Sequence, residues 1–192
     1  MNITKDNLLD LSLGVRAALN KELRAVHEER NLEAAWQHVA DRLEEKALID
    51  HLEELHSILL KGMLPDADLG VFRREAVYML NESENFALKE IKANQDEIKE
   101  EIQSLKQALQ GLKGLERLAL EHVGLLDIHP FTDGNGRVCR FILAVGLLRM
   151  GAKYCYGFLK KDDEYKDVME EVFRKQDSDI FLKYLRNMVH FN

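Results

Sequence analysis

The segment HPFTDGNGR, residues 129–137, constrains this chain more than any other stretch of its 192 residues. It places a histidine, a carboxylate, an amide, two glycines and an arginine between two strongly apolar segments, LALEHVGLLDI and FILAVGLLRM. Apolar runs with little polar interruption are typical of helices that are buried on most sides. The sequence therefore predicts two buried helices joined by a short polar loop, with Gly151 as the stop of the second helix.

Most of the remaining chain also has helical periodicity. Leucines and valines recur at three- and four-residue steps before residue 62, where Asn31 is a candidate helix cap. Residues 63–70, with a proline, two aspartates and a glycine, form the clearest break, and residues 71–80 favour extended structure. We expect a short hairpin or flap there.

The second half of the chain predicts further helices. We expect helix from about residue 86 to 126 with a break at Gly111 and Gly114, and two closing helices near 162–176 and 178–190. The predicted fold is one all-α domain over residues 1–192. It comprises N-terminal helices in 1–62, a flap region in 63–87 that carries a short β-hairpin, and a helical core in 88–192.

Composition excludes several classes of function. The formal net charge is -7 and no block of lysines or arginines stands out, so we expect no nucleic-acid partner. The apolar runs fall short of a bilayer span, and MNITKDNLLD lacks the apolar core of a signal peptide. With only two cysteines as well, we expect no membrane partner and a cytoplasmic location, with delivery into a host cell left open.

The glycines of the loop predict an anion site. Gly134 and Gly136 let the backbone adopt left-handed conformations and approach a ligand closely, and Asn135 between them tolerates the same region and can donate an amide hydrogen bond. The helix that begins here offers free N–H groups and the positive end of its dipole. We therefore expect this segment to cradle an anion such as phosphate.

The charged residues beside the cradle predict transfer chemistry. Arg137 and Arg140 lie three residues apart, and guanidinium groups match phosphate oxygens in pairs. Asp133 is the carboxylate that could hold Mg²⁺ together with phosphates. His129, at the opposite side of the loop, can take a proton near neutral pH. Together these groups indicate nucleotidyl or phosphoryl transfer to a hydroxyl.

Simpler interpretations exist for each residue alone. A histidine before proline is commonly a turn residue, and a DGNG loop is commonly a tight turn. A calcium loop is excluded because Arg137 occupies its third ligand position, and a Walker loop because no glycine-lysine-serine follows. His122 and Cys139 are expected to be structural core residues, and Trp36 to pack between helices.

HPFTDGNGRVCR resembles the Fic signature, HPF-x-[DE]-GNGR-x-x-R, at every defined position. LHSILLKGMLPDADLGVFRREAV is similar to the family's segment that leads into a flap, and LEHVGLLDIHPF to the helix that delivers the histidine. The closing helices, with Tyr165, resemble the C-terminal part of the family's core. The resemblance implies an all-α Fic-type helical bundle that transfers AMP from ATP to a Tyr, Thr or Ser hydroxyl of a target protein.

The resemblance implies a role for each matching residue. His129 would be the general base, Asp133 the Mg²⁺ ligand and Phe131 the anchor of the loop in the core. The nucleotide-binding residues would be Gly134, Asn135, Gly136, Arg137, Arg140 and Tyr165. The target-binding flap would include Phe72, Arg73 and Val77. ATP would be the substrate that donates AMP, with Mg²⁺ as cofactor.

Regulation and several alternatives stay open at this point. Many Fic proteins carry an inhibitory [ST]-x-x-x-E-[GN] helix whose glutamate pairs with the last motif arginine, and no segment of this sequence matches it. Inhibition by an antitoxin-like partner or by a missing helix is therefore open, and we expect the isolated chain to be active. The alternatives are transfer of UMP or phosphocholine, removal of AMP, and a helical interaction module without catalysis.

Overall fold

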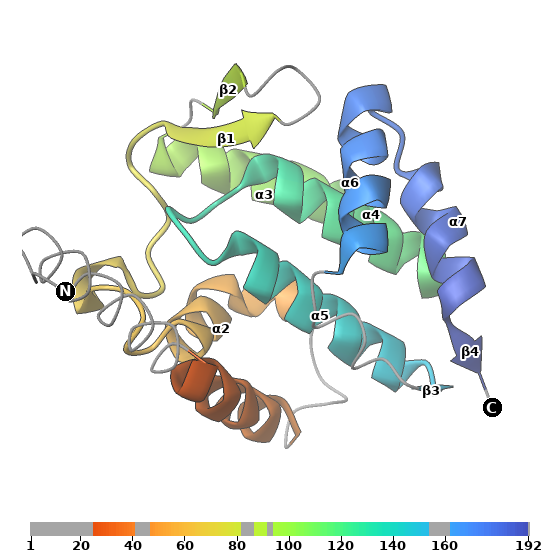
Figure 1. The fold of residues 1–192 in the computed structure, drawn as a ribbon, viewed down its shortest axis with the longest axis horizontal. Helices are drawn as coiled ribbons and strands as arrows, with labels where there is room; N and C mark the ends of the chain where they lie inside the picture. Colours follow the sequence, from red (N-terminus) through yellow and green to blue (C-terminus); the bar gives the residue numbers. More distant parts are fainter. Residues whose placement is uncertain (1–24, 41–46, 82–86, 92–93, 154–161, 192) are drawn as a thin grey trace, which may run out of the picture.

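The computed structural model describes residues 25–40, 47–81, 87–91, 94–153 and 162–191 of the chain. It is a bundle of helices with two small antiparallel strand pairs at its margins (Figure 1). The predicted all-α fold is confirmed.

A helix through residues 25–40 precedes the 3₁₀ turn η1 Leu48–His51, α2 Leu52–Leu59 and the 3₁₀ turn η2 Asp66–Asp68. The later helices are α3 Gln95–Ala108, α4 Gly114–Ile128, α5 Asn135–Arg149, α6 Asp163–Lys175 and α7 Asp179–Met188.

Helix α5 occupies the middle of the bundle (Figure 1). It packs on α4 on one side and on α2 on the other, while α4 also contacts α3 and α7. This position explains why the sequence of α5 is almost uniformly apolar, with buried residues Val138, Cys139, Phe141, Ile142, Leu143, Ala144, Val145 and Leu147. Among the described residues, no helix combines the length and the apolarity needed to cross a bilayer.

The core has two parts that meet at α4 and α5. One part joins the 25–40 helix, α2 and α3 to these two helices, and Trp36 packs on Phe141 there with ring centroids 5.0 Å apart. The other part lies between the same two helices and α6 and α7, around the fully buried Phe181. The loop between α4 and α5 therefore connects the two helices that both parts share.

The helix boundaries follow local signals. Asn94 caps α3 with a reciprocal hydrogen-bond pair to Glu97, which is a capping box. Gly111 and Gly114 have positive φ angles at the break before α4, and Gly151 has φ 79° just after α5. The predicted breaks at these glycines are confirmed.

Two predictions about the first half of the chain are wrong. The helix expected from about residue 86 begins only at Gln95, because residues 87–91 form a strand. Asn31 does not cap a helix start. It is buried within the 25–40 helix, where its Nδ2 donates to the carbonyl groups of Leu59 and Lys61 at the end of α2.

The strands form two separate pairs. β1 Val77–Asn81 pairs antiparallel with β2 Ala87–Ile91, with Val77 opposite Ile91. β3 Ala152–Lys153 pairs with β4 His190–Phe191 near the C-terminus. Figure 1 shows the first pair beside α3, at the margin of the bundle. That this pair serves as a flap over the active site stays a prediction.

The close approach of α4 and α5 generates a stability prediction. A Cβ atom on Gly146 would lie 2.3 Å from Leu118 Cδ2. Gly146→Ala should therefore destabilise the fold by about 1–3 kcal/mol, although alanine is the better helix former by roughly 1 kcal/mol. Urea unfolding measures the change, and Leu118→Ala should relieve the clash in the double variant. Ser104→Ala, on the exposed face of α3, is the control. A more stable Gly146→Ala protein would contradict this packing.

Candidate active site

Phe131 anchors the loop between α4 and α5 in the core. Its side chain is 1 % exposed, and its ring stacks on His56 with centroids 3.9 Å apart and planes 14° apart. Phe72 also packs on Phe131, with ring centroids 5.4 Å apart and planes tilted by 45°. The loop is thus held by contacts with an aromatic ring from α2 and with one from the segment before β1.

His56 also links the loop by hydrogen bonds. The backbone N–H of Gly70 donates to its Nδ1 at 2.9 Å, so the ring proton resides on Nε2. Nε2 then donates to the carbonyl oxygen of Asp133 at 3.0 Å. Burial lowers the pKa of His56 below its ordinary value of 6.5. The neutral ring fits this arrangement because only the neutral form can accept from Gly70.

Asn135 has a different role from the one predicted. Its Oδ1 accepts the Phe131 N–H at 2.9 Å and its Nδ2 donates to the Phe131 carbonyl at 2.7 Å. The side chain is 2 % exposed and closes the loop on itself. The predicted donation of its side-chain amide to a ligand is therefore wrong, because both of its polar atoms already bind Phe131.

The start of α5 fits the predicted anion cradle. Gly134, the residue before the helix, has φ 83°, and a Cβ there would lie 2.8 Å from the Leu60 side chain. No side chain caps this helix start. Its first N–H groups and the positive end of the helix dipole are thus available for an anion.

His129 ends α4 in a strained backbone conformation. Its φ and ψ are 51° and 59°, in the left-handed region that non-glycine residues rarely adopt. Such a conformation costs about 1–3 kcal/mol and persists only where the surroundings hold it. Burial lowers the pKa of His129, the Leu126 carbonyl opposes this shift, and the charge of Arg73 adds to it. The ring is therefore neutral near pH 7, with its Nδ1 buried and without a hydrogen-bond partner in the described part of the chain.

Two of the three predicted flap residues are part of the scaffold instead. Phe72 is 7 % exposed and packs on Phe131, and Arg73 is 2 % exposed. The Arg73 Nε donates to the His129 carbonyl oxygen at 2.8 Å. Neither side chain can meet a target protein, so the prediction that they bind one is wrong. Val77, the first residue of β1, is partly exposed and remains a candidate.

Arg137 is paired with a glutamate that the sequence motifs did not reveal. Glu28, on the 25–40 helix, accepts from the Arg137 Nε at 3.1 Å and its Nη2 at 3.0 Å through the same Oε1. Glu28 precedes by one turn the buried Asn31, which fastens this helix to the end of α2. No inhibitory pattern surrounds Glu28, so only the folded chain could show this contact.

Arg140 lies beside Tyr165 of α6. Its Cζ lies 6.0 Å from the centroid of the Tyr165 ring, and its Nη1 would be 2.9 Å from a Cβ on Gly136. Tyr165 is 4 % exposed, so it contacts Arg140 from inside the core. The predicted nucleotide contact of Tyr165 does not fit this burial, and its position suits support of Arg140 instead.

A buried polar relay continues from Tyr165. Its hydroxyl donates to His122 Nε2 at 2.8 Å, and His122 Nδ1 donates to the Cys139 carbonyl at 3.2 Å. Burial lowers the pKa of His122 to about 3 and raises the pKa of the Cys139 thiol to about 12. The predictions that His122 and Cys139 are structural core residues are confirmed by their burial.

The residues present fit a magnesium ion that is shared with phosphates. The exposed Asp133 lies in the loop, and its Oδ1 accepts the Gly134 N–H at 2.6 Å. In the part of the chain that the structure describes, no group of three His, Cys, Asp or Glu residues could enclose a metal. One carboxylate suits Mg²⁺ only where phosphate oxygens and water complete the coordination.

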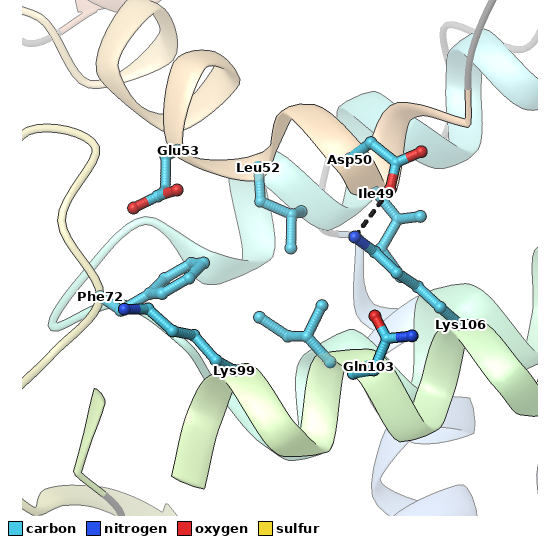
Figure 2. Close-up of a pocket in the computed structure, with 9 residues that line it drawn as sticks. Ile49, Asp50, Leu52, Glu53, Phe72, Lys99, Gln103 and Lys106 are labelled. Atoms are coloured by element: carbon cyan, nitrogen blue, oxygen red, sulfur yellow. Dashed lines mark ion pairs between the residues drawn. The ribbon is translucent and has the colours of Figure 1, made fainter. Parts of the chain in front are cut away.

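A cavity of about 200 Å³ lies between α3 and the η1–α2 segment, and none of its lining residues belongs to the loop (Figure 2). Figure 2 shows Lys106 of α3 reaching Asp50 across it, at 2.6 Å. The lining mixes acidic, basic and apolar side chains: Ile49, Asp50, Leu52, Glu53, Phe72, Lys99, Ile102, Gln103 and Lys106. Since its charges are balanced, the cavity is a weaker anion site than the loop.

A sequence model of the Fic/DOC family matches residues 46–147, just over half of the chain. This chain belongs to the Fic/DOC family. The matched range contains α2, α3, α4 and the whole loop, and it ends within α5.

Individual relatives agree with this assignment. The protein adenylyltransferase fic-1 of Caenorhabditis elegans is 30% identical over 106 residues, which are 54% of this chain and 20% of that protein. The Fic family protein of Desulfovibrio desulfuricans G20 has a similar fold, with a TM-score of 0.66 at 20% identity over 84% of this chain and 50% of the other. The BepC protein of Bartonella tribocorum, solved with bound AMPPNP, has a TM-score of 0.55 at 18% identity over 88% of each chain. The chain spans about a fifth of the length of the fic-1 relative.

The relay behind Arg140 generates a prediction about pH. The folded chain keeps His122 neutral down to about pH 3, whereas the unfolded chain protonates it near 6.5. Stability should therefore fall as pH drops below about 6.5, by up to about 1.4 kcal/mol per pH unit for this one histidine. Urea unfolding between pH 7 and 5 measures the slope.

His122→Gln is the variant that isolates this effect. In this variant the free energy of unfolding should depend less steeply on pH, because the contribution of His122 is gone. The contributions of His56 and His129, whose pKa values are also lowered, should remain. Identical slopes for the variant and the unchanged chain would contradict a neutral buried His122.

Proposed function

We propose that this chain transfers AMP from ATP to a Tyr, Thr or Ser hydroxyl of a target protein. The observation that carries the proposal is the α4–α5 loop. It joins a neutral histidine at one helix end to an uncapped helix start with two arginines. The relative named protein adenylyltransferase, and the AMPPNP bound to a protein of similar fold, support the same chemistry.

The phosphates would lie at the start of α5. Backbone N–H groups after Gly134 would bind the α- and β-phosphates, and Arg137 and Arg140 the outer phosphates. The arginines would stabilise the negative charge that develops on the pyrophosphate as it leaves. Asp133 would hold Mg²⁺ against the phosphates, and the ion would neutralise part of their charge.

His129 would act as the general base. Its Nδ1 is buried, which leaves Nε2 as the nitrogen that can reach a substrate. Nε2 would take the proton of the target hydroxyl as its oxygen bonds to the α-phosphorus. The bond between the α-phosphorus and the bridging oxygen breaks, and pyrophosphate leaves. The lowered pKa of His129 favours this role because the ring is unprotonated near neutral pH.

β1 would hold the target by backbone pairing. Within the described residues β1 pairs only with β2, so its other edge can accept an extended segment. Such pairing tolerates many sequences. Val77, at the start of β1, is the remaining flap candidate for a side-chain contact.

Removal of AMP is the second candidate, and Glu28 is the observation that favours it. Hydrolysis of an AMP-modified hydroxyl needs a carboxylate that can orient water. Glu28 lies 3.0 Å from Arg137, at the side of the phosphate site. The same loop could instead transfer UMP or phosphocholine. These activities differ from AMP transfer and AMP removal in the donor that they use, UTP or CDP-choline.

Donor labelling tests the proposed function. The chain is incubated with a cell lysate and ATP that is labelled on the α-phosphate or on the γ-phosphate, and with labelled GTP, UTP, CTP and CDP-choline. We expect label from α-labelled ATP only, because AMP is transferred and pyrophosphate leaves. Label from γ-labelled ATP would indicate phosphorylation, and no label from any donor would contradict a transferase.

His129→Ala should abolish this labelling and keep nucleotide affinity within about threefold of the unchanged chain, since the phosphates bind elsewhere. A fluorescence titration with a non-hydrolysable ATP analogue measures affinity. His190→Ala, at an exposed position in β4, is the control. Near-normal labelling by His129→Ala would remove it from the role of base.

Glu28→Gln should strengthen nucleotide binding. The carboxylate and a phosphate compete for the same Nε and Nη2 edge of Arg137. Because Glu28 is partly exposed, we expect a gain of only about two- to fivefold in affinity for the ATP analogue. Glu29→Gln, the exposed neighbour on the same helix, is the matched control. Equal affinities for both variants would show that Glu28 does not compete.

A further inference from the structure

Arg73 makes an unusual set of contacts with the end of α4. Its Nε donates to the His129 carbonyl at 2.8 Å, its Nη2 to the Ile128 carbonyl at 3.4 Å, and its backbone N–H to the Pro130 carbonyl at 2.9 Å. Nη1 donates to the Glu75 carbonyl at 3.1 Å. One buried residue therefore binds three consecutive carbonyl groups around the proposed base.

The backbone at His129 needs such support. The left-handed region is unfavourable for a residue with a Cβ, and the following Pro130 further favours extended structure at this position. Strained conformations persist where neighbouring groups over-determine them. The His129 N–H donates to Leu125, at 3.1 Å, which holds one side of the residue. Arg73 holds the other side.

The same residue leads directly into β1. Arg73 lies four positions before Val77, and the carbonyl of its neighbour Phe72 accepts from the Gln95 side chain at 2.7 Å. Gln95 is the first residue of α3, just after β2. The start of β1 and the end of β2, which lie opposite each other as Val77 and Ile91, are therefore both connected to the segment that carries Arg73.

We propose that Arg73 is a positioning residue that holds His129 in its left-handed conformation and couples the base to the strand β1. It contacts no substrate and acts through His129. Only the kinetic test of this inference rests on the proposed transferase function. Arg73 would thus position both the strand that binds the target segment and His129, the proton acceptor. This would keep the target hydroxyl and the imidazole correctly placed relative to each other.

Arg73→Gln and Arg73→Lys test the proposal, with the exposed neighbour Arg74→Gln as the matched control. Arg73→Gln should lower the rate of AMP transfer at saturating ATP by about 100-fold, because small displacements of a catalytic group have effects of this size. Affinity for the ATP analogue should stay within about twofold, since the phosphates bind at α5. Arg73→Lys should recover part of the rate through a single donor, and Arg74→Gln should match the unchanged chain.

Two kinetic outcomes would overturn the proposal. One is an unchanged transfer rate in Arg73→Gln. The other is a fall in rate with an equal fall in nucleotide affinity and a large loss of thermal stability, which would indicate a purely structural role. If Arg73→Gln does not fold, Arg73→Lys, which keeps the charge, takes its place in the same measurements.

Amide hydrogen exchange tests the placement without activity. The His129 N–H should exchange faster in both Arg73 variants, while the amides within α5 keep their protection. Equal exchange at His129 in all variants would refute the anchor. This readout holds even if the unchanged chain transfers no nucleotide, so a failure of the transferase proposal is distinguishable from a failure of this one.

Discussion

The packing of Phe131 against His56 and Phe72 is the contact on which the site depends. The loop between α4 and α5 is short, and its polar groups can be aimed at a ligand only if its backbone is immobile. Phe131 supplies that immobility, because its ring is fully buried and contacts a ring from α2 and a ring from the segment before β1. Asn135 then ties the backbone of Phe131 to the start of α5. The buried ring of Phe131 thus holds the polar groups of the loop in place.

The electrostatics of the site depend on burial. His56, His122 and His129 all have lowered pKa values, with desolvation as the largest cause in each. Neutral rings can accept hydrogen bonds or protons, which protonated rings cannot do. The positive charge near the loop is therefore carried by arginines, with Arg73 at the end of α4 and Arg137 and Arg140 at the start of α5. In the proposed mechanism, this division would separate proton transfer from phosphate binding within a single loop.

Local patterns in the sequence predicted the helices, the loop and the residue types of the site. They could not predict contacts between distant segments. Arg73 and Phe72 have the residue types of a binding surface, and only the fold shows that they lie under the loop. Glu28 is separated by about a hundred residues from Arg137, and no local motif marks it. Residues 87–91 have an ambiguous pattern, and pairing with β1 makes them a strand.

The two arginines of the loop connect different parts of the fold. Arg137 meets Glu28 on the 25–40 helix, and Arg140 meets Tyr165 on α6. They are three residues apart on α5, so both sit over its first turns, beside the helix start. A displacement of the N-terminal helix would act directly on Arg137 through Glu28, whereas Arg140 lies against Tyr165, whose hydroxyl binds His122 in the other half of the core. The phosphate site would thus combine one arginine that a surface helix can restrain with one that the core keeps fixed.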